Sequence, residues 1–355
     1  MGSSGHISWF ADIGLADRAH VGGKGGSLGE LQRAGVAIPP GFVVRTGAFE
    51  RFLATLERDT SVRSQVESLS SDDLEGITAC SKAIRPRLEQ APLPADVLEE
   101  LSCAHAKLCG NAGGALSSVP AVAVRSSATT EDAHDASFAG LQDTYLWVKD
   151  FDETIRRVRG CWASLYSVES ISYRRRRGFP EAGLAMAVVV QTMVDARTAG
   201  VMFTRSPTSG DPSVVTIEGA WGLGSAVVGG EVTPDRWVLG KITGEVSVRE
   251  ISDKLIQHAP AVRGGVETVP VEAELRRSPC MTDEQLQALR LVARKVEKHY
   301  GHAQDIEWAV DRHTGAILLL QSRPETVWSA RESAPVARGA DNPLSHVMSI
   351  FGGRR

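Results

Sequence analysis

The stretch DIEWAVDRHTGAILLLQSRP, residues 305–324, decides the fold, because it predicts a β-hairpin with polar chemistry on one face. Asp305 and Glu307 alternate with apolar residues, so we expect both carboxylates on one face of the first strand. After the turn and the apolar run ILLL, Gln321 and Arg323 likewise share one face of the second strand. The hairpin therefore predicts a paired surface with two carboxylates, an amide oxygen and a guanidinium.

This set of side chains suits a site for magnesium and phosphate. Mg²⁺ prefers carboxylate and carbonyl oxygens and bridges phosphate groups, and arginine clamps the remaining phosphate charge. The other interpretation is an exposed sheet face with cross-strand ion pairs. The spacing of the four residues alone leaves both interpretations open.

A second stretch, VGGKGGSLGEL at residues 21–31, is rich in glycine and contains Lys24. It is not a Walker A loop, because Gly25 follows the lysine where Ser or Thr is required. It is not a dinucleotide fingerprint either, because Leu28 stands in place of the third glycine. We expect a glycine turn and a short helix with Ser27 as its N-cap. Free amides at the helix start and the ammonium of Lys24 would make an anion site; a turn without a ligand is the alternative.

The composition is ordinary for a soluble α/β protein. The 355 residues are typical of about two domains. The net charge of −4 and the pI near 6.2 do not favour nucleic acid or an anionic membrane as partner. The five cysteines are scattered without a C-x-x-C pair, which favours a reducing compartment. Since no apolar run approaches the roughly 20 residues of a membrane span and no signal peptide is evident, we expect a cytoplasmic protein.

Two local patterns give further expectations. Residues 183–194 and 199–207 read as strands and are expected to form a hairpin with each other. The four consecutive arginines at 174–177 follow a long helical segment and are expected to be a solvated helix end.

The chain resembles the N-terminal nucleotide-binding domain shared by phosphoenolpyruvate synthase, pyruvate phosphate dikinase and rifampin phosphotransferase. Five stretches carry the resemblance, and they occur in the family's order from about residue 9 to 329. A single stretch is moderately specific, whereas five in order are strongly so. They read GGKGGSLGEL with GVAIPPGFVV, VAVRSSATTEDAHDASFAGLQDTYLWV, VVVQTMVDARTAGVMFTRSPTSG, EGAWGLGSAVVGGEVTPDRWVL, and DIEWAVD followed by LLLQSRPETVWS.

The resemblance implies an α/β (α+β) architecture, the two-lobed ATP-grasp fold. The N-terminal lobe would comprise residues 1–205, with the glycine and lysine stretch, a helical insertion and the strands beside adenine. The C-terminal lobe would comprise residues 206–328 and carry the hairpin for magnesium and phosphate. Residues 329–355 would be a flexible or partner-binding tail.

The resemblance also implies a role for each matching residue. Glu307 and Gln321 would hold magnesium, and adenine would dock where Gln191 precedes Met193 and Val194. The residues implied in catalysis are Lys24, Arg125, Asp305 and Arg323. Those implied in ATP binding are Lys24, Arg125, Gly140, Thr144, Gln191, Met193, Val194, Glu218, Glu307, Gln321 and Arg323.

The family reaction implies a partner for this chain. In the family, the ATP domain cleaves MgATP to AMP and phosphate and leaves the β-phosphate on a histidine of a separate swivelling domain. The sequence lacks that histidine motif, so we expect a separate histidine-bearing phosphocarrier subunit and a small-molecule acceptor bound elsewhere. Phenylphosphate synthase, which phosphorylates phenol, has such a split organisation. The alternatives are a fragment of phosphoenolpyruvate synthase or rifampin phosphotransferase, and a nucleotide-sensing subunit without turnover.

Overall fold

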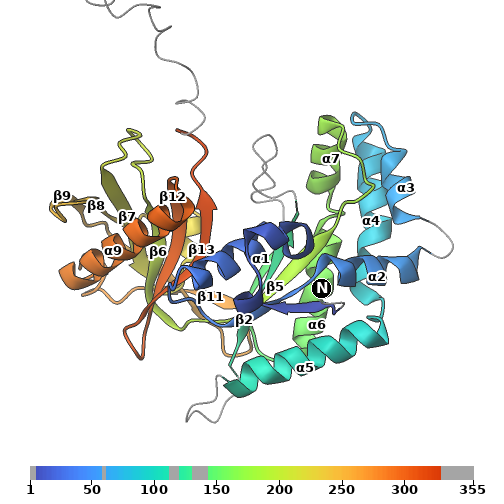
Figure 1. Ribbon diagram of the computed structural model, residues 1–355, viewed down its shortest axis with the longest axis horizontal. Helices are drawn as coiled ribbons and strands as arrows, with labels where there is room; N and C mark the ends of the chain where they lie inside the picture. The colour runs from blue at the N-terminus through green and yellow to red at the C-terminus, as the bar shows by residue number, and fades with distance from the viewer. Residues whose placement is uncertain (1–4, 58–60, 112–119, 130–142, 329–355) are drawn as a thin grey trace, which may run out of the picture.

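Helices and strands form two lobes in the computed structural model, which describes residues 5–57, 61–111, 120–129 and 143–328 (Figure 1). The first lobe is built on a sheet with the strand order β1-β2-β5-β3-β4, and the second on a sheet with the order β13-β12-β6-β7-β8-β9. Neighbouring strands in both sheets are antiparallel. The expected two-lobed fold of mixed helix and sheet is therefore confirmed, in its α+β form.

The first lobe packs helices against its sheet. Its strands are β1 (Ile7–Trp9), β2 (Gly41–Val44), β3 (Val122–Ala128), β4 (Thr144–Val148) and β5 (Met186–Thr192). Its helices are α1 (Arg18–Arg33), α2 (Thr46–Leu56), α3 (Val62–Glu67), α4 (Leu74–Gln90), α5 (Ala95–Asn111), α6 (Phe151–Ser164) and α7 (Val168–Arg177).

The second lobe has one long helix, α9, against its sheet (Figure 1). Its main strands are β6 (Ala196–Phe203), β7 (Val214–Trp221), β8 (Asp235–Gly240), β9 (Val246–Glu250), β12 (Gln304–Asp311) and β13 (Ile317–Pro324). The remaining elements are α8 (Ser225–Val228), α9 (Asp283–Tyr300) and a separate two-stranded sheet of β10 (Ile256–Pro260) and β11 (Val266–Pro270).

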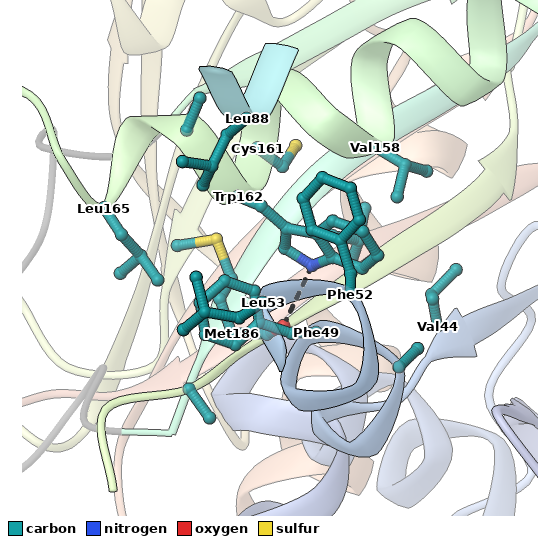
Figure 2. Packing of buried hydrophobic residues seen from close by; sticks show 14 of the residues in the cluster. Val44, Phe49, Phe52, Leu53, Leu88, Val158, Cys161, Trp162, Leu165 and Met186 are labelled. Atoms are coloured by element: carbon teal, nitrogen blue, oxygen red, sulfur yellow. Dashed lines mark hydrogen bonds between the residues drawn. The ribbon is translucent and has the colours of Figure 1, made fainter. Parts of the chain in front are cut away.

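The core of the first lobe is centred on Trp162 of α6, which is fully buried. Figure 2 shows its indole among aromatic and aliphatic side chains from α2, with the tilted ring of Phe52 at a centroid distance of 5.0 Å. The indole N–H donates to the carbonyl of Met186 at 3.1 Å. Because a buried N–H without a partner is costly, this bond fixes α6 against β5.

Helix α1 contains the glycine-rich stretch, and the expected glycine turn is confined to a kink at Gly22 that separates two helical segments. The helix is kinked at Gly22, whose φ of 70° and ψ of 179° are non-helical. The amide of Gly25 donates to Ser127 Oγ at 3.1 Å, so it is already satisfied by the first lobe. Ser27 is not an N-cap, because it lies inside the helix and donates to the carbonyl of Ser322 at 2.6 Å. The stretch connects α1 to β3 and to β13.

The kink allows a very close approach to β3, and this predicts a large effect of Gly22→Ala. A Cβ atom at this position would lie 2.1 Å from the carbonyl oxygen of Ser127, and its backbone conformation is essentially restricted to glycine. We expect the variant to lose at least ~2 kcal/mol of unfolding free energy in a denaturant titration. The control is Gly47→Ala on α2, where a Cβ meets nothing within 4 Å and helix propensity favours alanine. Equal midpoints for Gly22→Ala and wild type would contradict the close approach.

Two expectations about the chain between the lobes are corrected. β5 pairs with β2 and β3, whereas β6 pairs with β12 and β7, so residues 183–207 do not form a hairpin. The chain instead passes from one sheet to the other after Thr192. The second sheet therefore begins with β6, before the boundary expected at residue 205. The tail at 329–355 lies outside the described residues.

The arginine run is not wholly solvated, because Arg174 is buried. Its guanidinium pairs with Glu181 at 3.0 and 3.2 Å and donates to the carbonyl of Leu165 at 2.6 Å. The side chains of Arg174 and Glu181 are 1% and 0% exposed. Separately, within the part of the chain that the structure covers, no helix has the length and apolar character needed to cross a membrane.

Candidate functional site

The β12–β13 hairpin brings together the four polar side chains that the sequence predicts on one surface. Asp305 lies opposite Arg323, and Glu307 lies opposite Gln321. Directly opposed residues of an antiparallel pair project from the same face, so the predicted common surface is confirmed. Ile306, between the two carboxylates, is buried in the core of the second lobe.

A β-bulge in β13 shapes this surface. Glu307 lies opposite Gln321, but the next residue of β12 lies opposite Leu319, which leaves Leu320 as an extra residue. A bulged residue is left out of the ladder. The carbonyl of Leu320 accepts a hydrogen bond from Nη1 of Arg125 at 2.9 Å. The apolar run ILLL gives no sign of the bulge, and sequence reasoning missed this contact.

Arg125 of β3 reaches from the first lobe to the metal-ligand pair expected on the second. Its Nη2 donates to Oε2 of Glu307 at 3.1 Å and to Oε1 of Gln321 at 2.5 Å. The arginine side chain is only 10% exposed. A single guanidinium thus contacts three oxygens of the opposite lobe and holds the two lobes together at the candidate site.

Asp305 and Arg323 form the second pair of the surface. Oδ2 of Asp305 lies 3.4 Å from Nε of Arg323, whose side chain is half exposed. Burial raises the pKa of Asp305 to about 6, although the positive charge of Arg323 favours the ionised carboxylate. The neighbouring Glu325 adds to the rise. The exposed guanidinium of Arg323 is available to an anion that approaches from solvent.

The raised pKa of Asp305 predicts a pH-dependent effect of Asp305→Asn. The folded-state pKa of about 6 lies above the ordinary value of 3.8, so the folded protein binds this proton more tightly than the unfolded chain. The contribution of Asp305 to the free energy of unfolding therefore falls as the pH rises from 4 to 6, and the loss persists above that range. Asparagine cannot ionise, so the variant should be more stable than wild type at about pH 8 by up to ~3 kcal/mol.

The measurement is the melting temperature of both proteins as a function of pH. Near pH 4, where Asp305 is largely protonated in wild type, the two should nearly coincide. A difference between them that stays constant across the whole range would contradict the raised pKa.

Glu218 lies on the same sheet face as Glu307. Val201 of β6 stands opposite both residues in the register, so two strand spacings, about 10 Å, separate their backbones. Burial raises the pKa of Glu218, and Arg236, 3.9 Å away, opposes the rise. Its role as a nucleotide contact stays a prediction.

Lys24 is half-buried in α1, close to α6. Burial raises the pKa of the Cys161 thiol on α6, and the positive charge of Lys24 opposes that rise. Its contact with phosphate stays a prediction.

The adenine-side residues lie where the chain crosses between the sheets. Gln191 is buried, and its side-chain amide donates to the carbonyl of Pro39 at 3.1 Å. Met193 and Val194 belong to an apolar cluster between the lobes, here called the inter-lobe cluster. Its buried members are Val194, Ala196, Ala199, Leu223 and Ala309, and its partly buried ones are Trp147, Met193, Val266, Leu318 and Leu320.

Thr144 begins β4 directly opposite Arg125 of β3. Its side chain is therefore expected on the face that carries the Arg125 guanidinium. Thr144 is exposed, so this hydroxyl is open to a ligand. Gly140 lies outside the described residues.

The expected magnesium site passes a chemical test. Oε2 of Glu307 and Oε1 of Gln321 converge on one cationic group, Nη2 of Arg125. Mg²⁺ is commonly held by one or two carboxylates together with substrate phosphates and water, so two protein oxygens are a sufficient set. Among the described residues, no group of three or more His, Cys, Asp or Glu side chains is arranged to hold a metal.

The chain belongs to the family of the pyruvate phosphate dikinase AMP/ATP-binding domain, which matches residues 18–342. The resemblance inferred from the five stretches is thereby confirmed.

Curated relatives agree with this family. A probable phosphoenolpyruvate synthase of Methanocaldococcus jannaschii is 36% identical over 335 residues, covering 94% of this chain and 28% of the relative. One of Staphylothermus marinus is 38% identical and covers 92% of this chain and 42% of the relative. A rifampicin phosphotransferase of a Streptomyces species is 40% identical, and the match covers 89% of this chain and 35% of the relative. The chain thus spans less than half the length of these relatives.

Solved structures give weaker likenesses. D-alanyl-alanine synthetase A of Vibrio cholerae is 12% identical and matches 70% of this chain and 54% of its own with a TM-score of 0.26. The ADP complex of purK, N5-carboxyaminoimidazole ribonucleotide synthetase, is 9% identical. The match covers 72% of this chain and 58% of that chain, with a TM-score of 0.22.

Proposed function

We propose that the chain is the ATP-binding component of a phosphotransferase that cleaves MgATP to AMP and phosphate and phosphorylates a histidine on a partner subunit. The observation that supports this proposal is that Arg125 from one lobe donates hydrogen bonds to Glu307 and Gln321 from the other. The phosphorylated partner would pass its phosphate to a small-molecule acceptor, for which phenol is a candidate because of the split organisation of phenylphosphate synthase.

Each residue of the site would have its own role in phosphoryl transfer. Such transfer depends mainly on positioning and on neutralising charge. Glu307 and Gln321 would hold magnesium, which would supply positive charge to neutralise the phosphates. Arg125 and Arg323 would bind phosphate oxygens, and Lys24 would add a further positive charge. None of these side chains has to act as a covalent nucleophile.

Arg125 has to change partners in this proposal. In the structure its guanidinium contacts the two oxygens that magnesium would need. The bond to Glu307 is already charge-assisted, and a bound triphosphate would offer the guanidinium charge-assisted hydrogen bonds of the same kind in exchange. Glu307 and Gln321 would then be free to serve as ligands at the moment when the phosphate arrives.

Glu307→Gln tests the catalytic role. The substitution removes the one carboxylate of the metal pair, so we expect the formation of AMP from MgATP to fall by at least ~10²-fold. The assay incubates the purified chain with MgATP, alone and with the proteins that co-purify with it, and follows AMP and acid-labile phosphohistidine. Because Glu307 is 29% exposed, the melting temperature should change little.

The matched control is Glu99→Gln, an exposed glutamate on α5. It should leave both the rate and the melting temperature at the wild-type values. Unchanged AMP formation in Glu307→Gln would remove this residue from the metal site. Tight ATP binding without AMP under any pairing would favour a nucleotide-sensing subunit instead.

A second proposal follows from the longer relatives. Phosphoenolpyruvate synthases and a rifampicin phosphotransferase match this chain over 28–42% of their own length. The same ATP chemistry would then serve a histidine on the same polypeptide, as a fragment of such an enzyme. Isolation of the native protein and its mass would separate this case from a two-subunit system.

A further inference from the structure

A cavity of about 250 Å³ lies on the second lobe, where the segment between β9 and β10 meets the segment between β11 and α9. Asp253 lines it from the first segment, and Ala273, Arg276 and Arg277 line it from the second. None of these four residues is implied in ATP binding, magnesium binding or catalysis. The cavity is therefore separate from the candidate ATP site in its residues.

The cavity is also remote from the polar hairpin in the order of the strands. The segment that carries Asp253 is bonded to Asp235 of β8, whereas Glu307 lies on β12. Because β6 and β7 stand between these strands, three strand spacings, about 14 Å, separate β8 from β12. A ligand in the cavity would therefore not share the oxygens of Glu307.

Two arginines converge on one carboxylate in the wall of the cavity. Arg276 donates from Nε to Oδ1 of Asp253 and from Nη2 to Oδ2, both at 2.8 Å. Arg277 donates from Nε and Nη2 to the same Oδ2 at 3.2 and 3.0 Å. The hydrogen bond from Arg276 lowers the pKa of Asp253, so this carboxylate is ionised at neutral pH.

The cluster of Asp253, Arg276 and Arg277 stays cationic, because two guanidinium charges face a single carboxylate charge. Two further carboxylates of the same segment, Glu272 and Glu274, lie outside the cavity lining. Both residues are exposed to water, and dissolved salt screens their charge. The cavity wall is therefore positively charged where the arginines lie.

A buried ion pair holds both segments in place beneath the cavity. The side chains of Lys254 and Asp235 are each 0% exposed and are paired with one another. Asp235 also accepts the backbone amides of Ser252 and Cys280, both at 2.9 Å, and the amide of Lys254 donates to the carbonyl of Arg276 at 3.0 Å. Exposed ion pairs contribute little to stability. The buried pair, rather than the arginine cluster, therefore fixes the walls.

The arginines have donors left for a ligand. Each guanidinium contacts Asp253 through Nε and Nη2, which leaves its Nη1 group for a further acceptor. Arginine binds phosphate through charge-assisted hydrogen bonds. Phosphate oxygens point in several directions, so one phosphate can accept from two arginines, whereas a carboxylate has both oxygens in one plane. The apolar methyl group of Ala273 suits contact with an organic substituent of the phosphate.

We propose that this cavity binds a small phosphate monoester, whose phosphate accepts hydrogen bonds from the Nη1 groups of Arg276 and Arg277. The site is an anion site of the second lobe beyond the proposed function, and it does not depend on ATP binding. Its ligand would contact the segments on either side of the β10–β11 hairpin.

The test measures the affinity for glycerol 3-phosphate by calorimetry, with glycerol as the arm that lacks phosphate. Wild type should bind glycerol 3-phosphate and not glycerol. Since each arginine supplies a charge-assisted hydrogen bond, Arg276→Gln and Arg277→Gln should each weaken binding by about 10- to 100-fold. Arg277 is 82% exposed, so its variant should keep the melting temperature of wild type.

Two controls make the result specific to the cavity. Arg249→Gln removes the same charge from an arginine of β9 that is paired with Asp283 and lies outside the cavity lining. Arg125→Gln removes a guanidinium from the candidate ATP site. Both variants should bind glycerol 3-phosphate as wild type does.

The outcomes separate this site from the proposed function. Weaker binding in Arg276→Gln and Arg277→Gln, with both controls unchanged, supports the inference. Absence of binding to wild type at millimolar concentrations, or wild-type affinity in both cavity variants, overturns it and leaves the proposed ATP chemistry untouched. Weaker binding in Arg125→Gln alone would place the anion at the candidate ATP site and would likewise overturn the inference.

Discussion

Arg125→Gln is expected to lower AMP formation from MgATP by about 10³-fold, because an arginine that stabilises a transferring phosphoryl group contributes on this scale. ATP affinity should fall by about 10- to 100-fold as charge-assisted hydrogen bonds are lost. Glutamine retains hydrogen-bonding capacity but carries no charge. The rate is measured with the co-purifying phosphate acceptor, and the affinity by calorimetry on the chain alone.

Two comparisons make the Arg125 result specific. Arg294→Gln, on the exposed side of α9, should change neither quantity. Arg125→Lys keeps the charge but not the planar fork that reaches three acceptors at once, so it should recover only part of the rate. If Arg125→Gln left both affinity and rate unchanged, Arg125 would serve only as a contact between the lobes.

Arg174→Ala is expected to give the largest loss of stability, about 3–5 kcal/mol of unfolding free energy, because it leaves a buried carboxylate without its partner. Glu181 is 0% exposed and receives two hydrogen bonds from Arg174. The measurement is a denaturant titration followed by tryptophan fluorescence, since Trp162 reports on the core of the same lobe.

The controls for Arg174 separate burial from charge. Arg176→Ala removes an exposed member of the same run and should stay within about 0.5 kcal/mol of wild type. The double variant Arg174→Met with Glu181→Leu removes both buried charges and should recover most of the loss. If Arg174→Ala lost no more unfolding free energy than Arg176→Ala, the buried pair of Arg174 and Glu181 would not contribute to stability as its burial implies.

Local alternation was enough to predict the polar face of the hairpin. Asp305 and Glu307 are two residues apart, and so are Gln321 and Arg323, and a strand places such residues on one side. The bulge at Leu320 changes the pairing after Glu307 but leaves these two pairs intact. This is why the shared face of these four residues was predictable although the bulge was not.

Contacts between distant segments were not predictable. The strands at 183–194 and 199–207 are both apolar and close in sequence, yet each pairs with other strands. The burial of Arg174 depends on Glu181, seven positions away in a loop after α7, and a run of four arginines does not reveal which one faces the core. The kink at Gly22 likewise depends on β3, about a hundred residues later.

Helix α1 has a consequence for how the protein folds. Val21 and Leu28 pack with residues of β2 and β5, whereas Leu31 lies in the core of the second lobe. Val36, just after the helix, is buried in that same second core. The segment from 196 to 328 therefore lacks part of its own hydrophobic interior. Because α1 contributes to the cores of both lobes, we expect the lobes to unfold in a single transition.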